Sequence, residues 1–391
     1  PSAQHCSPSM TDSVLLTADT VATGSELLRP GWIEVRGPEI LGVGAGAPPS
    51  HGRVRELGNV VVTPGFVDTH VHGGGGGSFT SAAEGGPVAD FHARHGTTTL
   101  LASLVSAPPD ELLRQTAALA ELVADGVIAG IHLEGPWLST HRCGAHDPAA
   151  LRDPESGELD RLLAAGAGAI RMVTLAPERP GALSAVARIV AEGAVAAVGH
   201  TEATYEQTRA AIDVGATVGT HLFNAMAPVH HREPGPVIAL LEDPRVTVEL
   251  IADRVHLHPS LYRQVAGLVG INRVSLVTDA MAAAGMPDGD YRLGSLPVRV
   301  DAGVARVAGT ETIAGSTATM DRVFANAVAD GGPGGDAELL AAVRAACVNP
   351  ARALGLSPRG LVAGAGADLV VLDTDLVVSA VMRDGRWLPV D

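Results

Sequence analysis

Side chains that could bind a metal ion follow short apolar runs at five places in this 391-residue chain. In chain order they are His70 and His72, Glu134, His200, His221 and Asp279. Alternate residues of a strand point to one face, so His70 and His72 can hold the same ion. His200 and His221 would hold a second ion, with the Glu134 carboxylate between the two.

Asp279, the last of these residues, is the best placed to move protons. Coordination to a metal lowers the pKa of water towards ~7, so a nearby carboxylate can accept a proton from that water and return it to a leaving amine. His146, in the loop that follows Glu134, could polarise a carbonyl oxygen. A solvent-facing loop histidine without a catalytic role is an equal interpretation.

The sequence contains no lysine, so every basic side chain is arginine or histidine. This excludes Schiff-base chemistry on a protein lysine, phosphate binding by a P-loop lysine, and the carboxylated lysine that bridges two metals in many hydrolases. Two metals in this chain would therefore need a carboxylate bridge, and Glu134 is the candidate.

Each of these residues has a simpler interpretation when it is taken alone. A single buried histidine is more often a hydrogen-bonded core residue, and an aspartate at a strand end often caps the next helix. A cluster of them at one end of a fold is different, because burying so many polar groups without a metal would cost several kcal/mol. We therefore expect a metal site.

Three further features near these residues are not expected to take part in the chemistry directly. Residues 73–77 are all glycine but lack the spacing of a phosphate-binding loop, so they are expected to be flexible backbone beside the site or an ordinary loop. Cys143 is interpreted as a free thiol on a mobile loop. Asp253 could hold a residue of the site from behind, but a loop cap is the favoured interpretation.

The metal-competent residues must be positioned by a repeating architecture. Short β-branched runs, expected to be strands, occur at residues 60–67, 97–105, 127–133, 169–175, 194–198, 216–220, 246–251 and 273–277. Helical periodicity between them is clearest at 109–124, 182–192, 204–214 and 259–268. This alternation predicts the α/β class and a (β/α)8 TIM barrel of the metal-dependent hydrolase type, with catalytic residues at the carboxyl ends of its strands.

The two ends of the chain have a different pattern. Short alternating runs broken by glycine and proline predict that residues 11–58 and 359–391 together form a small β-sandwich beside a barrel at 59–358. The turn signals Asp288-Gly289 and Asp301 to Gly303 predict a β-hairpin insertion at about 288–311. Helical patterns at 318–328 and 338–347 are expected to close the barrel.

Composition narrows the partners and the compartment. The net charge of −16 would repel nucleic acid and anionic lipid. No apolar run reaches the ~18 to 20 residues of a membrane span, and residues 1–10 do not resemble a signal peptide. Cys6, Cys143 and Cys347 lie far apart, which argues against a disulfide framework. We expect a soluble cytoplasmic protein.

Several of the segments discussed above belong to longer motifs. Residues 64–72 (PGFVDTHVH) resemble the opening motif of the amidohydrolase superfamily. Five later segments resemble one family of this superfamily, the N-acetylglucosamine-6-phosphate deacetylases. They are 132–138 (HLEGPWL), 199–201 (GHT), 220–226 (THLFNAM), 232–235 (REPG) and 276–280 (LVTDA). The resemblance runs in order from about residue 11 to 388.

The resemblance implies an assignment for each site residue. Glu134, His200 and His221 would bind a metal, Asp279 would donate and accept the proton, and His146 would lie near the acetyl carbonyl. The implied substrate contacts are Ala145, His146, Asn224, Ala225, Arg232, His256, Ile313, Ala314 and Gly315, with Arg232 and His256 on the phosphate. His70 and His72 imply that a second ion can bind. Zn, Fe, Mn and Co all suit such ligands.

The activity implied by the resemblance is hydrolysis of the acetamide of N-acetyl-D-glucosamine 6-phosphate to D-glucosamine 6-phosphate and acetate, a step of amino sugar catabolism and cell-wall recycling. It also implies a homodimer in which Arg232 reaches the active site of the neighbouring subunit. Two alternatives stay open. One is another amidohydrolase, such as a D-aminoacylase or a cyclic-amide hydrolase, and the other is a catalytically silent relative that acts as an assembly protein.

Overall fold

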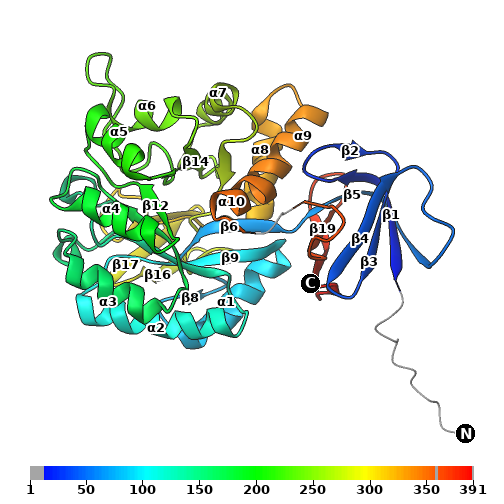
Figure 1. Cartoon of the computed structure of the whole chain (residues 1–391), viewed down its shortest axis with the longest axis horizontal. Helices are drawn as coiled ribbons and strands as arrows, with labels where there is room; N and C mark the ends of the chain where they lie inside the picture. Colours follow the sequence, from blue (N-terminus) through cyan, green and yellow to red (C-terminus); the bar gives the residue numbers. More distant parts are fainter. Residues whose placement is uncertain (1–12, 357–359, 390–391) are drawn as a thin grey trace, which may run out of the picture.

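The computed structural model describes residues 13–356 and 360–389, and its larger part is a barrel of parallel strands (Figure 1). The strands are β6 (Phe66–Val71), β9 (Thr97–Leu104), β10 (Gly130–Glu134), β11 (Ile170–Leu175), β12 (Val195–Val198), β13 (Val218–Gly219), β14 (Thr247–Leu250) and β15 (Val274–Leu276). The ring closes between β15 and β6, where the Asp279 N–H donates to the His70 carbonyl at 2.9 Å. The predicted (β/α)8 barrel is confirmed.

A helix follows each barrel strand and covers the outside of the barrel (Figure 1). The helices are α1 (Ala82–Arg94), α2 (Pro109–Ala124), α3 (Ser156–Gly166), α4 (Ala182–Ala191), α5 (Tyr205–Val214), α6 (Gly235–Glu242), α7 (Pro259–Val269) and α8 (Met320–Gly331). Each packs an apolar stripe on the strands; in α4 this stripe is Ala182, Ala185, Val186 and Ile189. The four helices predicted between strands are present, with bounds that differ from the predictions by one residue at most.

Two more helices complete the catalytic unit after α8. They are α9 (Asp336–Val343) and α10 (Asn349–Ala353), joined by a π-helical turn (Arg344–Val348). Asn349 is fully buried, and its side-chain amide donates to the carbonyls of Ile271 and Val274 at 2.9 and 2.8 Å. The helix predicted at 338–347 therefore corresponds to α9 and the π-helical turn.

Both ends of the chain together build a second β-structure beside the barrel, as predicted, and it is a single hydrogen-bonded sheet where a sandwich was expected (Figure 1). Its strands are β1 (Val14–Ala22), β2 (Leu27–Leu28), β3 (Gly31–Arg36), β4 (Glu39–Ala45), β5 (Arg53–Pro64), β19 (Leu369–Leu372), β20 (Val378–Arg383) and β21 (Arg386–Trp387). Hydrogen bonds join them in one curled sheet. Ile40, in the edge strand β4, donates its N–H to the carbonyl of Ala365, which precedes β19, at 2.9 Å. The curled sheet encloses a separate apolar core.

The strand predicted at 60–67 is wrong in its bounds. Residues up to Pro64 belong to β5, which pairs with β1 and β19, and the first barrel strand begins at Phe66. The chain changes sheets at Gly65, where a side chain would lie 2.0 Å from the Thr98 hydroxyl. The expected boundary at residue 59 therefore falls at Gly65. The other expected boundaries, at 11, 358, 359 and 391, and Cys6 lie outside the described residues.

The insertion after β15 has one strand more than the predicted hairpin. Its antiparallel strands are β16 (Gly289–Leu293), β17 (Leu296–Asp301) and β18 (Val304–Val307). The chain then returns to the barrel, where the Ser316 N–H donates to the Asp279 carbonyl at 2.7 Å. No helix in the described ranges has the length and apolar character needed to cross a bilayer.

An ion-pair network around one buried carboxylate joins the end of α6 to α5 and supports a test of the fold. Asp243 is 3% exposed, and its carboxylate accepts hydrogen bonds from the Arg209 and Arg245 guanidinium groups, each with a contact of 2.7 Å. The Arg245 guanidinium, more than any other group, holds the pKa of Asp243 well below its usual range. We expect Asp243→Asn to lower the free energy of unfolding by about 1.5–3 kcal/mol at pH 7, measured by urea denaturation.

Because the folded-state pKa of Asp243 is depressed, its contribution to stability is fully present above the unfolded-state pKa of ~3.9 and is lost as the pH falls through the folded-state value. The difference in unfolding free energy between wild type and Asp243→Asn should therefore shrink below about pH 4. A difference that is absent at pH 7, or that does not change in acid, would contradict this account.

Candidate active site

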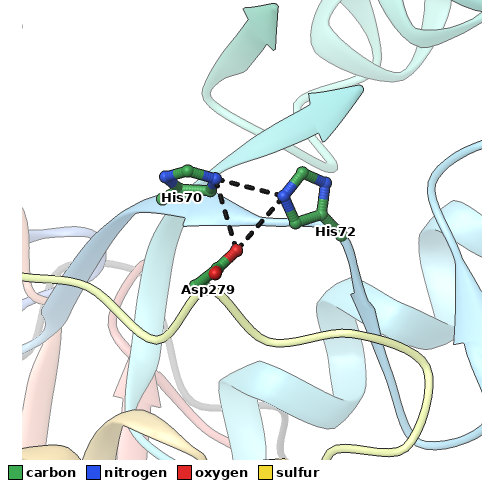
Figure 2. Close-up of side chains that lie close together, drawn as sticks. All are labelled: His70, His72 and Asp279. Atoms are coloured by element: carbon green, nitrogen blue, oxygen red, sulfur yellow. Dashed lines mark hydrogen bonds and ion pairs between the residues drawn. The ribbon is translucent and has the colours of Figure 1, made fainter. Parts of the chain in front are cut away.

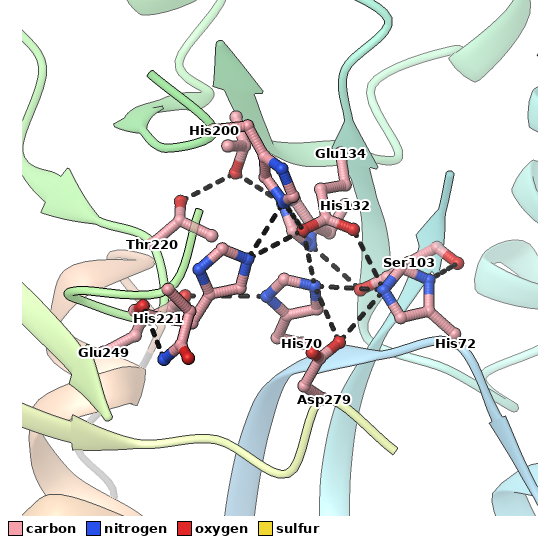
Figure 3. Close-up of polar contacts among 12 residues, drawn as sticks. His70, His72, Ser103, His132, Glu134, His200, Thr220, His221, Glu249 and Asp279 are labelled. Atoms are coloured by element: carbon pink, nitrogen blue, oxygen red, sulfur yellow. Dashed lines mark hydrogen bonds and ion pairs between the residues drawn. The ribbon is translucent and has the colours of Figure 1, made fainter. Parts of the chain in front are cut away.

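The metal-competent side chains predicted from the sequence meet at the carboxyl ends of the barrel strands (Figure 3). Each of them is less than a tenth exposed to solvent. Their ligand atoms form three overlapping groups that could hold a metal ion: His70, His72 and Asp279; His70, Glu134 and His221; and Glu134, His146 and His200. The structure therefore brings together residues that are far apart in the sequence, such as His70 and Asp279.

The Glu134 carboxylate lies at the centre of this cluster. Its Oε1 atom is 3.0 Å from the Nε2 atoms of both His200 and His221. Its Oε2 atom is 3.1 Å from Nε2 of His72 and 3.3 Å from Nε2 of His146. A carboxylate that contacts imidazoles through both oxygens is the bridge that a protein without lysine requires.

Asp279 completes the group that contains His70 and His72, which lie in β6 and at its carboxyl end (Figure 2). Its Oδ1 atom is 3.4 Å from Nε2 of His70 and 3.2 Å from Nε2 of His72. The two Nε2 atoms are themselves 3.1 Å apart. As the alternation of strand residues predicts, both rings face the same point.

Two of the rings are oriented by main-chain carbonyls. Nδ1 of His72 donates to the Ser103 carbonyl at 3.2 Å, and Nδ1 of His200 donates to the Arg142 carbonyl at 2.9 Å. Because a carbonyl can only accept, each Nδ1 carries a hydrogen, and Nε2 is the atom presented to the cluster. This is the usual orientation of histidines that bind a metal through Nε2.

The backbone is strained where three of the strands end. His200, His221 and Asp279 have φ values of 49°, 28° and 50°, in the left-handed region that side chains other than glycine rarely adopt. Such conformations cost of order 1–3 kcal/mol each and concentrate at functional sites. Here the side chains of His200 and His221 contact Glu134, and that of Asp279 contacts His70 and His72.

The charges of the cluster favour a cation at its centre. Burial by itself raises the pKa of Glu134, but the surrounding histidines, His70 foremost, hold it well below its usual range. Burial lowers the pKa of His72, but hydrogen bonds to Asp279 and Glu134 raise it to about 9. The negative charge that favours a proton on these nitrogens equally favours a metal ion in its place. The ligand atoms therefore fit a divalent metal ion.

His146 lies in the site and is not a solvent-facing loop histidine. The Ser106 N–H donates to its Nδ1 atom at 3.1 Å, so this nitrogen carries no hydrogen and the neutral ring is protonated on Nε2. Burial lowers the pKa of His146 to about 4, which keeps the ring neutral at pH 7. The Nε2–H group faces Glu134 and is available as a hydrogen-bond donor.

A cavity of about 370 Å³ opens onto the cluster. The residues that line it and that were predicted to contact substrate are Ala145, His146, Asn224, Ala225, His256, Ile313 and Gly315. Cavities of similar or larger volume occur at the amino ends of the barrel strands, but the candidate metal ligands lie at the opposite end. The catalytic cavity is therefore the smaller one that contains the ligands.

His256 is held on one side of this cavity by Asp253. The Asp253 Oδ2 atom is 2.7 Å from Nδ1 of His256, while its Oδ1 atom accepts from the main-chain N–H groups of Val255 and His256. Asp253 is thus both a loop cap and the partner of His256. Burial lowers the pKa of His256, but the hydrogen bond that its ring donates to the Asp253 carboxylate raises it above its usual value.

Two of the predicted substrate residues do not reach the cavity of their own chain. Ala314 is fully buried in an apolar cluster formed with the insertion, between Ile313 and Gly315. Arg232 lies on an exposed loop, where its guanidinium is 2.7 Å from Nε2 of His231. Arg232 is absent from the residues that line the cavity.

The glycine run at residues 73–77 has a packing role that sequence reasoning missed. It forms the short strands β7 (Gly73–Gly74) and β8 (Gly77–Ser78). A side chain at Gly74 would lie 2.6 Å from Nε2 of His92, which donates to the Gly73 carbonyl at 2.9 Å. These glycines allow close packing, and none of them lines the cavity. Cys143 has a free thiol and does not line the cavity either.

Several cavity residues were not predicted from the sequence. The loop after β10 contributes His141 and Arg142, and the segment after β18 contributes Glu311 and Thr312. The basic pair His141-Arg142, a few residues before His146, was a signal that could have been used. Ser103 and Ser106, which hold the imidazoles, have no comparable signal.

Comparisons with known proteins agree with this site. The sequence model of the amidohydrolase family matches residues 61–388. A point mutant of an N-acetyl-D-glucosamine-6-phosphate deacetylase from Mycobacterium smegmatis, solved in complex with N-acetyl-D-glucosamine-6-phosphate, is 63% identical, with a TM-score of 0.95 over 96% of this chain and 99% of that one.

Two curated relatives have lower identities. An N-acetylgalactosamine-6-phosphate deacetylase from Escherichia coli O157:H7 is 37% identical over 92% of this chain and 96% of its own length. The human N-acetylglucosamine-6-phosphate deacetylase is 37% identical over 85% of this chain and 84% of its own length. Since the family model spans most of the chain and these relatives cover nearly all of it, the chain belongs to the amidohydrolase family.

Proposed function

We propose that this chain hydrolyses the acetamide of N-acetyl-D-glucosamine 6-phosphate to D-glucosamine 6-phosphate and acetate. The observation that carries the proposal is the cavity in which Asp279 and His146 face the buried ligand cluster, in a chain 63% identical to a deacetylase solved with this substrate. Amide hydrolysis requires a proton acceptor, a group that stabilises charge on the carbonyl oxygen, and an electrophilic centre. The cavity contains a candidate for each.

Glu134, His200 and His221 would hold one divalent ion, and His70, His72 and Asp279 a second. Zn is the preferred ion, and Fe, Mn and Co are alternatives. When bound, such an ion supplies positive charge that makes water more acidic and the acetyl carbon more electrophilic. The protein contributes the remaining steps through its own side chains.

Asp279 accepts a proton from the attacking water while the water oxygen bonds to the acetyl carbon. The carbon–nitrogen bond then breaks, and Asp279 delivers the proton to the departing amine. His146 donates its Nε2–H to the acetyl oxygen, where negative charge develops. Because the Ser106 N–H holds Nδ1 as an acceptor, this donor needs no rearrangement during the reaction.

The substrate phosphate must be bound by an acidic chain without lysine. His256 lines the cavity and carries a raised pKa, so it can supply one positive charge. Arg232 would supply the second from the neighbouring subunit of a homodimer, since it is exposed and does not line the cavity of its own chain. Arginine suits this role because its planar fork pairs with two phosphate oxygens. We place this homodimer in the cytoplasm.

A second sugar phosphate is also a candidate substrate. The relative from Escherichia coli O157:H7 is named for N-acetylgalactosamine 6-phosphate and matches 92% of this chain. The two sugars differ only in the orientation of the hydroxyl at carbon 4, and both carry the same acetamide and phosphate. A direct comparison of the two substrates is therefore part of the test.

Acetate release should be measured with N-acetylglucosamine 6-phosphate, its galactosamine counterpart and unphosphorylated N-acetylglucosamine, in metal-loaded and chelator-treated protein. We expect the glucosamine phosphate to have the highest kcat/KM, and the unphosphorylated sugar to lose at least about 100-fold because the paired phosphate contacts are missing. Chelation should abolish turnover, and Zn²⁺ should restore it. Full turnover without metal, or no preference for phosphate, would refute the proposal.

Asp279→Asn keeps the shape of the side chain but removes its basicity. We expect kcat to fall about 10²–10⁴-fold, the usual contribution of a general acid–base group, while the affinity for substrate changes much less. Single-turnover kinetics and equilibrium binding of the substrate separate the two effects. If kcat stays within a few-fold of wild type, Asp279 is not the proton carrier.

Subunit mixing tests the position of Arg232. Asp279→Asn and Arg232→Ala should each be nearly inactive, but a heterodimer of the two has one site with an intact Asp279 and a donated Arg232. With random exchange, activity should rise to about a quarter of the wild-type value, because half of the dimers are mixed and each of those has one complete site. Exchange is verified with differently tagged chains. Verified exchange without recovered activity would place Arg232 in its own subunit or outside the reaction.

A further inference from the structure

A carboxylate stands directly behind one of the candidate metal ligands. Glu249, in β14, is 1% exposed, and its Oε2 atom is 3.7 Å from Nδ1 of His70, on the opposite side of the ring from Asp279 (Figure 3). The other oxygen, Oε1, accepts a hydrogen bond from the Thr69 hydroxyl at 2.6 Å. Thr69 precedes His70 in β6, so the carboxylate is tied to the strand that carries the ligand.

Nδ1 of His70 and Oε2 of Glu249 face each other and have no closer polar partner among the described residues. Among the described residues, neither Nδ1 of His70 nor Oε2 of Glu249 has a hydrogen-bond partner, and the ion pair of Glu249 is with His70. A buried carboxylate is unfavourable unless positive charge lies nearby. Within the part of the chain that the structure describes, the ion-pair partner of Glu249 is the His70 ring, whose other nitrogen faces the ligand cluster. Positive charge in that cluster would therefore stabilise the Glu249 carboxylate.

The other candidate ligands differ from His70 in this respect. The Nδ1 atoms of His72 and His200 contact main-chain carbonyls, and Nδ1 of His221 has no hydrogen-bond partner within the described residues. A carboxylate behind a histidine raises the basicity of the ring and determines which nitrogen carries the hydrogen. His70 is therefore the ligand whose donor strength depends on a replaceable side chain.

We propose that Glu249 is a positioning residue that keeps the hydrogen of His70 on Nδ1, directs Nε2 towards the ion, and thereby determines occupancy of the site formed by His70, His72 and Asp279. The carboxylate does not touch substrate. The inference rests on the proposed metal ligands and is independent of the identity of the sugar.

The test replaces the carboxylate by its neutral isostere in Glu249→Gln and measures metal binding directly. Zn²⁺ content is determined on dialysed protein, and the two dissociation constants are obtained by competition with a chromophoric chelator. We expect the weaker constant to rise about 10–100-fold, the usual effect of losing an outer partner of a metal ligand. Stoichiometry should fall from near two towards one, while the ion at Glu134, His200 and His221 is retained.

Glu178→Gln is the matched control. Glu178 is a partly buried carboxylate at the same end of the barrel, and it accepts hydrogen bonds from the Thr201 hydroxyl and the Glu202 N–H without contacting an imidazole. Its loss should leave both dissociation constants within a few-fold of wild type. Absorption spectra of the Co²⁺-loaded proteins provide a second readout, and only Glu249→Gln should change the band of the second ion.

If wild type binds two ions and Glu249→Gln binds both with unchanged affinity, this inference is overturned while the proposed metal ligands stand. If wild type binds only the ion at Glu134, His200 and His221, both the second site and the role of Glu249 are wrong. Should Glu249→Gln fail to fold, Thr69→Val releases the same carboxylate from the other side. An unchanged dissociation constant for the second ion in Thr69→Val would also contradict the proposal.

Discussion

The rest of the structure depends on one unfavourable arrangement, a carboxylate buried among imidazoles. Glu134 contacts four histidine rings within 3.3 Å. The surrounding charges hold the pKa of Glu134 down and raise that of His72, so the group is stable only with positive charge at its centre. Protons can supply that charge, and a divalent metal supplies it more effectively. The chemistry of the site follows from this requirement.

The barrel provides the rigidity that such a cluster needs. Each candidate ligand lies at or just beyond the carboxyl end of a barrel strand, and three of the residues adopt left-handed conformations there. These turns are costly, and the closed parallel sheet and its buried core offset them. The rim is further fixed by contacts such as that between the His70 carbonyl and the Asp279 N–H, which joins the first and last strands. The ligand geometry is therefore a consequence of barrel closure.

Recognition of an anionic substrate is the second constraint, because the protein is strongly acidic and contains no lysine. Positive charge near the cavity comes from loops outside the strands: Arg142 follows β10, and His256 follows β14 and is held by Asp253. The insertion formed by β16–β18 brings the segment around Ile313 against Asp279. The candidate metal ligands thus lie at the ends of the barrel strands, whereas these further cavity residues lie on the loops and on the segment after the insertion.

Local sequence pattern was enough to predict the barrel and to identify the candidate metal ligands. His70, Glu134 and Asp279 each stand at the end of an apolar run, and the run marks the strand that positions them. The point where the chain passes from one sheet to the other, and the groups that orient the histidine rings, could be found only in the three-dimensional structure. The apolar stretch through Gly65 is continuous in sequence, and only its choice of strand partners divides it between β5 and β6. Ser106 determines the tautomer of His146, and Glu249 reaches the strand of His70 through Thr69, from 40 and 180 residues away. Contacts across such separations leave no periodicity to detect, because they depend on how the barrel closes rather than on any neighbouring residue.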